Sequence, residues 1–198
     1  YIMDLSSIIL IVVAYLLGSV SFAILVSHFF HLKDPRYYGS NNPGATNVMR
    51  SGNKLAALLT LLGDALKGFL IVFIAIHYHF SPLTIALVSI AVVLGHMFPI
   101  FFKFQGGKGV ATAIGVIYSL SWPVGLIMCV LWLILLFITR ISSLSALITY
   151  LACPLLSLYF LDEKIYQVTL TMICLLVIMR HKDNIIKLLQ RKENKVGK

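Results

Sequence analysis

Long apolar stretches, separated by short polar links, dominate this sequence and decide which folds are open to it. Hydrophobic residues make up 60% of the 198 positions, and charged residues make up only 12%. A soluble domain is about half apolar and roughly a quarter charged, so it could not bury this much apolar surface. We therefore predict an all-α integral membrane protein that forms a single polytopic membrane domain over residues 1–198.

Seven of these stretches are candidate transmembrane helices, since a helix needs ~20 apolar residues to cross ~30 Å of hydrocarbon. They cover residues 5–30, 55–78, 83–102, 110–120, 123–139, 144–161 and 165–179. The fourth is short and partly polar, so a re-entrant element is an alternative to a crossing. The first has neither a basic leader nor a small-residue cleavage site, and we expect it to be a retained span.

The distribution of basic residues favours seven crossings. If all seven segments cross, only Lys164 of the 16 lysines and arginines lies outside, which leaves 15 inside. If the fourth segment did not cross, Arg140 and the basic C-terminal tail would lie outside, against the positive-inside rule. We therefore predict seven transmembrane helices, with the N-terminus outside and the C-terminus cytoplasmic. The same rule accounts for the net charge of +9 without a nucleic-acid partner.

Four polar regions then lie on the cytoplasmic face, at about residues 31–53, 103–112, 140–143 and 180–198. In the first region, Gly39 and Gly44 can take a positive φ and turn backbone N–H groups towards an anion. Arg50 offers a planar guanidinium group that suits a phosphate. Further donors are Ser40, Asn42, Thr46 and Asn47. An anion site and a capped connecting loop fit this composition about equally well.

The second region places three glycines around Lys108, directly before the fourth apolar segment. Gly106, Gly107 and Gly109 let the backbone approach a ligand closely, and the start of a helix attracts a phosphate. The spacing is not that of a Walker A motif, so no nucleotide is implied. A tight turn without a ligand is the alternative interpretation.

The last two regions contain polar residues at helix starts. His181 and Asn184 are three positions apart, so they share one face of a helix. Ser142 and Ser143 could donate hydrogen bonds to a ligand, but capping of the sixth span is the favoured interpretation.

Polar residues within the spans have structural explanations. Asp64 and Lys67 are three positions apart, and we expect them to form an ion pair. We expect His96 to be a buried, hydrogen-bonded histidine rather than a catalytic one. The three cysteines lie in apolar runs without metal-ligand spacing, and we interpret them as apolar filler. No metal site is predicted.

Three motifs together resemble one bacterial family. They are Gly39-Ser40-x-Asn42-Pro43-Gly44-Ala45-Thr46-Asn47, Gly106-Gly107-Lys108-Gly109-Val110-Ala111-Thr112 and His181-x-x-Asn184-Ile185. In this order they resemble the cytoplasmic motifs of the bacterial acyl-phosphate:glycerol-3-phosphate acyltransferases, the PlsY family. Asp64, Lys67 and Glu193 match further positions of that family. Asn41 departs from it, because many members have glycine there, but asparagine tolerates a left-handed backbone.

The resemblance implies a seven-helix enzyme of the bacterial cytoplasmic (inner) membrane whose active site faces the cytoplasm. It would transfer a fatty acyl group from acyl phosphate to the 1-hydroxyl of sn-glycerol 3-phosphate, giving lysophosphatidic acid and phosphate. Neither acyl-CoA nor acyl carrier protein would be the donor, and no cofactor is implied. Membrane lipid is the other partner.

The matching positions suggest roles for individual residues. The catalytic candidates are Ser40, Arg50, Lys108, His181 and Asn184. The substrate-binding candidates are Asn42, Gly44, Thr46, Asn47, Gly106, Gly107, Gly109, Ser142 and Ser143. Direct transfer, with a substrate phosphate accepting the proton, and covalent catalysis by Ser40 are both compatible with this set.

Two other classes of protein remain as alternatives. A transporter of a phosphorylated anion would also place polar loops on one face of a helix bundle. A phosphotransferase acting on lipid headgroups would need acidic residues to hold a metal, and Asp64 is the only acid clearly within a span.

Overall fold

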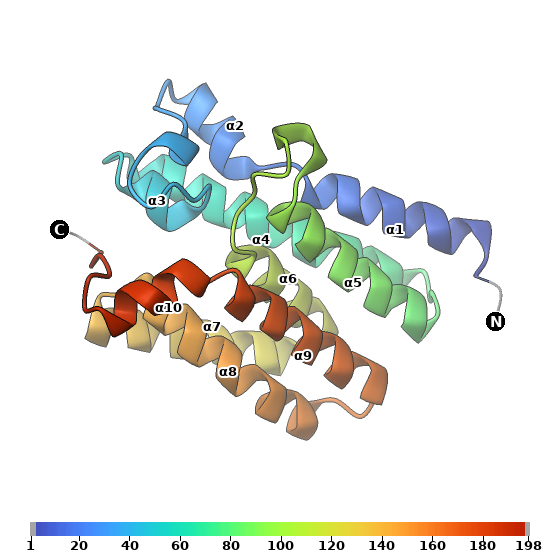
Figure 1. Ribbon diagram of the computed structural model, residues 1–198. Helices are drawn as coiled ribbons and strands as arrows, with labels where there is room; N and C mark the ends of the chain where they lie inside the picture. Colours follow the sequence, from blue (N-terminus) through green and yellow to red (C-terminus); the bar gives the residue numbers. More distant parts are fainter. Residues whose placement is uncertain (1–2, 197–198) are drawn as a thin grey trace.

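A computed structural model describes residues 3–196, and all its regular elements are helical (Figure 1). The predicted domain 1–198 and polar region 180–198 thus extend slightly beyond the described residues. The N-terminal half contains α1 (Leu5–Gly18), α2 (Phe22–Phe29), α3 (Ala45–Met49), α4 (Lys54–His77) and α5 (Pro82–Met97). The C-terminal half contains α6 (Val110–Leu120), α7 (Trp122–Thr139), α8 (Ser142–Phe160), α9 (Lys164–Met179) and α10 (Lys182–Leu189). Two short 3-10 helices are η1 (Pro35–Tyr37) and η2 (Ile100–Phe102).

The chain is an all-helical integral membrane protein. Among the described residues, four stretches are long and apolar enough to cross a membrane alone: α4, α5 extended to Phe102, α7 and α8. The bent pairs α1–α2 and α9–α10 raise this number to six if each pair is one span. Helix α6 has 11 residues and falls below this length.

The predicted first span over residues 5–30 is not one helix, because the chain bends by 44° between α1 and α2. Gly18 lies so close to the backbone of α5 that a Cβ atom would collide with the Val92 carbonyl. The Ser19 hydroxyl donates to the Tyr15 carbonyl at 2.9 Å, and the Lys67 ammonium donates to the Val20 carbonyl at 2.6 Å. A contact from α4 therefore satisfies the Val20 carbonyl at the bend.

Helix α6 lies between α4 and α7, and contacts with α4 and α8 fix its first half. Gly115 approaches the Ala65 carbonyl of α4 so closely that a side chain would collide there. On the other side, the buried Tyr150 of α8 donates its hydroxyl to the Val110 carbonyl at 2.7 Å. Small residues at such contacts let membrane helices pack tightly. The start of α6 is thus held rigidly at one end of the bundle.

Figure 1 shows that α2, α3, α10 and the C-terminus gather at this end, while the N-terminus lies at the opposite end. Large apolar side chains remain exposed along the outer helices, including Phe137 at 86% and Tyr159 at 83%. Such surface suits lipid rather than water. The polar regions named from the sequence all lie at the end that contains α3 and α10.

Candidate active site

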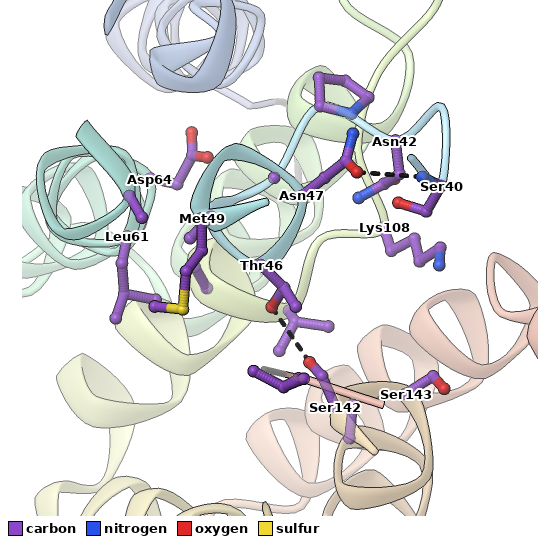
Figure 2. A pocket seen from close by; sticks show the side chains of 18 of the residues that line it. Ser40, Asn42, Thr46, Asn47, Met49, Leu61, Asp64, Lys108, Ser142 and Ser143 are labelled. Carbon is purple, nitrogen blue, oxygen red and sulfur yellow. Dashed lines mark hydrogen bonds between the residues drawn. The ribbon is translucent and has the colours of Figure 1, made fainter. Parts of the chain in front are cut away.

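A cavity of about 260 Å³ lies where α3, α10 and the starts of α4, α6 and α8 meet. Its polar lining includes Ser40, Asn42, Thr46, Asn47, Arg50, Lys108, Ser142, Ser143, His181, Asn184 and Glu193. Its apolar lining includes Met49, Ala57, Leu58, Leu61, Trp132, Leu136 and Ala146. In Figure 2, Met49 and Leu61 lie on one side of the cavity, and Ser40 and Lys108 lie on the other. The cavity thus combines a polar wall and an apolar wall.

The loop before α3 is organised around Asn47, which is 2% exposed. Its side-chain oxygen accepts from the Ser40 backbone N–H at 3.0 Å, as Figure 2 shows. Its side-chain N–H₂ group donates to the carbonyls of Pro35 at 2.8 Å and Tyr38 at 3.1 Å. The amide of Asn47 is therefore used to shape the loop, and its predicted role in orienting a substrate is indirect in this geometry.

The backbone of this loop partly follows the sequence expectations. Gly39 has φ +59° and Asn41 has φ +54°, so both occupy the left-handed region as predicted. Gly44 does not, because its φ is −158°. It is the residue before α3, where extended backbone is the usual conformation. Gly44 therefore does not use its freedom to take a positive φ.

Ser142 and Ser143 do not cap α8, which corrects the favoured interpretation of this pair. The residue before the helix is Ile141, and no side chain caps it. The Ser142 hydroxyl lies 3.1 Å from that of Thr46, and this bond links α8 to α3 (Figure 2). Ser143 Oγ is buried without a hydrogen-bond partner within residues 3–196. Both hydroxyls face the cavity region that the sequence analysis connected with a ligand.

The glycine loop divides into a supporting part and a part that reaches the cavity. Gly106 and Gly107 do not line the cavity, whereas Lys108 and Gly109 do. Gly107 donates its N–H to the His96 carbonyl at 3.1 Å. The Arg180 guanidinium donates to the carbonyls of Gly106 at 3.1 Å and Gly107 at 3.3 Å. The loop is thus fastened from behind, and these two glycines lie outside the lining of the cavity.

Gly109 takes a φ of +84° at the residue before α6. This conformation favours glycine and directs the chain from the loop into the helix. The next residues, Val110 and Ala111, also line the cavity. The positive end of the α6 dipole therefore lies at the cavity beside Lys108.

Lys108 is a half-buried cation of the site. Its ammonium donates to the side-chain oxygen of Asn184, whose N–H₂ group donates to Glu193 Oε1 at 3.0 Å. Burial lowers the pKa of Lys108 to about 8, while the carboxylate of Glu193 opposes this shift. Arg50, by contrast, lies exposed at the end of α3. The cationic side chains of Arg50, Lys54 and Lys108 therefore reach the cavity from three separate segments.

His181 is 2% exposed, and its Nδ1 lies 2.7 Å from the Val177 carbonyl. Because a carbonyl only accepts, Nδ1 must carry the proton. Burial lowers the pKa of His181 to about 4, so the imidazole is neutral at pH 7. Its Nε2 atom is then an acceptor, which suits a hydroxyl better than a phosphate oxygen. As a catalytic candidate, His181 therefore offers an acceptor for a hydroxyl group.

A buried ion pair lies behind the cavity, as the sequence analysis expected. Lys67 Nζ lies 2.8 Å from Asp64 Oδ1 and 3.1 Å from His96 Nδ1. His96 is 6% exposed, so the expectation of a buried, hydrogen-bonded histidine is confirmed. Asp64 and His96 also line the cavity. The inclusion of His96 in the pair was not predicted.

Three residues of the site escaped the sequence analysis as functional candidates. Arg180 was considered only as a tail charge, and Trp132 only as part of an apolar run. Glu193 entered only through the resemblance. The local pattern does not distinguish Arg180, since its partners Gly106 and Gly107 lie far away in the sequence. The adjacency of Arg180 to His181 was the one available signal.

The chain is similar to known acyltransferases along nearly its whole length. Residues 8–191 match the sequence profile of a family described as Glycerol-3-phosphate acyltransferase. The glycerol-3-phosphate acyltransferase of Neisseria meningitidis serogroup C (strain 053442) is 49% identical over 191 residues, which cover 94% of this chain and 96% of that protein. The corresponding protein of Burkholderia ambifaria (strain MC40-6) is 50% identical over 187 residues, covering 93% and 88%.

Two solved structures have the same fold. They are crystal structures of PlsY (YgiH), described as an integral membrane glycerol 3-phosphate acyltransferase. The glycerol 3-phosphate form has a TM-score of 0.92 and 36% identity, covering 97% of this chain and 96% of that one. The lysophosphatidic acid form has a TM-score of 0.90 and 35% identity, covering 96% and 95%.

Proposed function

The chain belongs to the glycerol-3-phosphate acyltransferase family, and from this premise we propose that it acylates the 1-hydroxyl of sn-glycerol 3-phosphate with acyl phosphate as donor. The products are lysophosphatidic acid and phosphate. One observation carries the proposal beyond family membership: Lys108, Arg50 and the start of α6 meet at one cavity that also has an apolar wall. Such a cavity suits two phosphorylated reactants, one of which has a fatty chain.

Acyl phosphate fits this site better than a thioester donor. Its phosphate group matches the cationic wall, and its chain matches Leu58, Leu61 and Trp132. The H-x-x-x-x-D pattern of acyl-CoA-dependent acyltransferases does not occur in this sequence. We therefore expect neither acyl-CoA nor acyl carrier protein to serve as donor.

The proposed reaction is a direct transfer. Lys108, Arg50 and the start of α6 hold phosphate, and His181 Nε2 accepts a hydrogen bond from the 1-hydroxyl. The hydroxyls of Ser143 and Thr46 orient the donor. The 1-hydroxyl oxygen forms a bond to the acyl carbonyl carbon, the bond from that carbon to the phosphate oxygen breaks, and the hydroxyl proton moves to phosphate. Fixed positive charge stabilises the anionic transition state.

Covalent catalysis by Ser40 is the alternative mechanism. Its hydroxyl has no histidine or lysine bonded to it within residues 3–196, whereas an activated serine needs an adjacent base. Direct transfer is therefore favoured. Mass spectrometry of protein quenched after mixing with palmitoyl phosphate alone should find no acyl ester on Ser40; a stoichiometric ester would establish the covalent route.

We further propose seven spans, with α6 as the fourth, and an active site on the cytoplasmic side of the bacterial inner membrane. The starts of α4, α6 and α8 contribute Lys54, Val110 and Ser142 to the cavity. The ends of α5 and α7 contribute His96 and Leu136 to the same cavity. This alternation fits a full crossing by α6, and the positive-inside rule places the cavity in the cytoplasm.

The test is an assay of purified protein in detergent with palmitoyl phosphate and radiolabelled glycerol 3-phosphate. We expect labelled lysophosphatidic acid to form, and none with palmitoyl-CoA. Product formation without a closed compartment would also exclude the transporter alternative. Absence of product with both donors would overturn the proposed function, and product only with palmitoyl-CoA would overturn the proposed donor.

A further inference from the structure

A second carboxylate lies in this cavity besides the ion-paired Asp64, and the proposed reaction does not use it. Glu193 lines the cavity, and its Oε1 atom accepts from the Asn184 side chain at 3.0 Å. Its Oε2 atom is buried and has no hydrogen-bond partner within residues 3–196. A buried carboxylate oxygen without a donor is costly. The arrangement therefore leaves a strong acceptor to be satisfied by a ligand.

Backbone hydrogen bonds on both sides of Glu193 fix its position. It lies on a C-terminal strap, which we define as residues 190–196. The strap begins where the Lys192 N–H donates to the Lys187 carbonyl at 2.8 Å. It ends where the Val196 N–H donates to the Arg140 carbonyl at 2.7 Å, in the link between α7 and α8. Backbone bonds on both sides thus hold the carboxylate against the cavity.

The chemistry of Oε2 restricts what it can recognise. An ionised carboxylate only accepts hydrogen bonds, and it repels a phosphate. A hydroxyl group is the natural donor to it in a site for a phosphorylated polyol. Asn184 connects Glu193 to Lys108, so the acceptor lies next to the ammonium that holds phosphate in the proposed function.

We propose that Glu193 is a specificity-determining residue whose Oε2 accepts a hydrogen bond from the 2-hydroxyl of glycerol 3-phosphate. This inference rests on the proposed function. In that substrate, the carbon with the 2-hydroxyl neighbours the carbon that bears the phosphate. A carboxylate beside the phosphate-binding lysine therefore meets the 2-hydroxyl before the reacting 1-hydroxyl. Glu193 would select polyol phosphates over phosphates that lack the second hydroxyl.

The test compares kcat/KM for glycerol 3-phosphate and for 3-hydroxypropyl phosphate, which has the same primary hydroxyl and phosphate but no 2-hydroxyl. We expect the wild-type protein to prefer glycerol 3-phosphate by roughly 10- to 100-fold, because a hydrogen bond to a charged group is of that strength. In Glu193→Ala this preference should fall towards one. Any general loss from a loosened Asn184 lowers both substrates alike and cancels in the ratio.

Two further variants keep the test decisive. Glu193→Gln retains an oxygen for Asn184, so it serves if the alanine variant does not fold, and its preference should lie between the two. Asp183→Asn removes an exposed negative charge that also acts on Lys108, and it should keep the wild-type preference.

An equal loss of kcat/KM for both substrates, with the preference unchanged, would mean that Glu193 only supports Asn184, and the inference would fall. A wild-type ratio of kcat/KM near one for the two substrates would also contradict the inference. Acylation of neither substrate by the wild-type protein would instead remove the proposed function itself.

Discussion

The charge of Lys108 should change within a pH range in which enzyme activity can be measured. Burial lowers the pKa of its ammonium to about 8, whereas an ordinary lysine titrates near 10.4. The charged form therefore prevails below pH 8 and is lost as the pH rises above it. Because kcat/KM reports groups of the free enzyme, its value for glycerol 3-phosphate should fall above pH 8 by up to about tenfold per pH unit. Initial rates between pH 6 and 10 measure this.

Removal of the charge should nearly abolish activity without unfolding the protein. We expect Lys108→Ala to lose roughly 100- to 1000-fold in kcat/KM, since one electrostatic contact to a transition state contributes about that much. Arg50→Ala should lose activity in the same direction. Lys103→Ala is the matched control, because Lys103 is exposed and lies outside the cavity.

Residual activity of Lys108→Ala should also lack the decline above pH 8. Turnover close to that of the wild-type protein, or an unchanged alkaline decline, would contradict the role of Lys108. Retention of the helical circular dichroism signal separates a lost charge from a lost fold.

At the residue scale, the sequence identified most of the polar groups that gather in the cavity but not all their tasks. Motif chemistry pointed to Arg50, Lys108 and Asn184, and all three line one cavity. It could not foresee that Asn47 shapes its own loop or that Ser142 bonds to Thr46. Such roles depend on which side chains meet in the folded chain, and these contacts cannot be read from the local sequence.

At the scale of elements, Arg180 connects α9 to the glycine loop, and this link should be testable. Arg180→Ala would leave the carbonyls of Gly106 and Gly107 without a charged donor. Lys108 would then be less well positioned, so we expect KM for both substrates to rise about tenfold. The free energy of unfolding should fall by about 1–3 kcal/mol. Steady-state kinetics and thermal unfolding in detergent measure the two effects.

Lys182→Ala is the control for Arg180, because Lys182 is the exposed cation two positions further along. It should leave both KM values and the unfolding temperature nearly unchanged. Equal effects of the two substitutions would mean that net charge, and not support of the loop, explains the result.

Hydropathy predicted the positions of the helices well, since apolar length is a property of local sequence. The bend between α1 and α2 was missed because its cause is tertiary. Gly18 packs against α5, and Lys67 reaches the Val20 carbonyl from α4. A continuous apolar run from residue 5 to 30 contains no signal strong enough to reveal either contact.

At the scale of the whole molecule, charge and hydropathy together predicted more than either did alone. Hydropathy left the short α6 ambiguous, and the positions of Arg140 and Lys164 favoured a crossing. The start of α6 and the end of α7 line one cavity, and the full crossing by α6 stays a proposal. The orientation of the bundle in the membrane is predicted from the distribution of basic residues, because the helices themselves do not distinguish the cytoplasmic side from the outer side.

Single cysteines can determine that side. We expect His79→Cys, in the link between α4 and α5, to react with a membrane-impermeant maleimide on intact spheroplasts. Lys195→Cys, on the C-terminal strap, should react only after the membrane is permeabilised. Both positions are exposed, so the membrane alone accounts for the difference. The unmodified chain is the control, because Cys153 and Cys174 are buried and Cys129 is only partly accessible.

The labelling of Lys195→Cys also distinguishes the two roles considered for α6. A re-entrant α6 would reverse every later helix and bring position 195 to the outer surface, where the reagent would reach it in intact spheroplasts. Position 79 precedes α6 and would keep its labelling in both cases. Labelling at both positions would therefore contradict seven crossings, and labelling at position 195 alone would contradict the orientation itself. Either result would separate the active site from the cytoplasmic pool of its phosphorylated substrates.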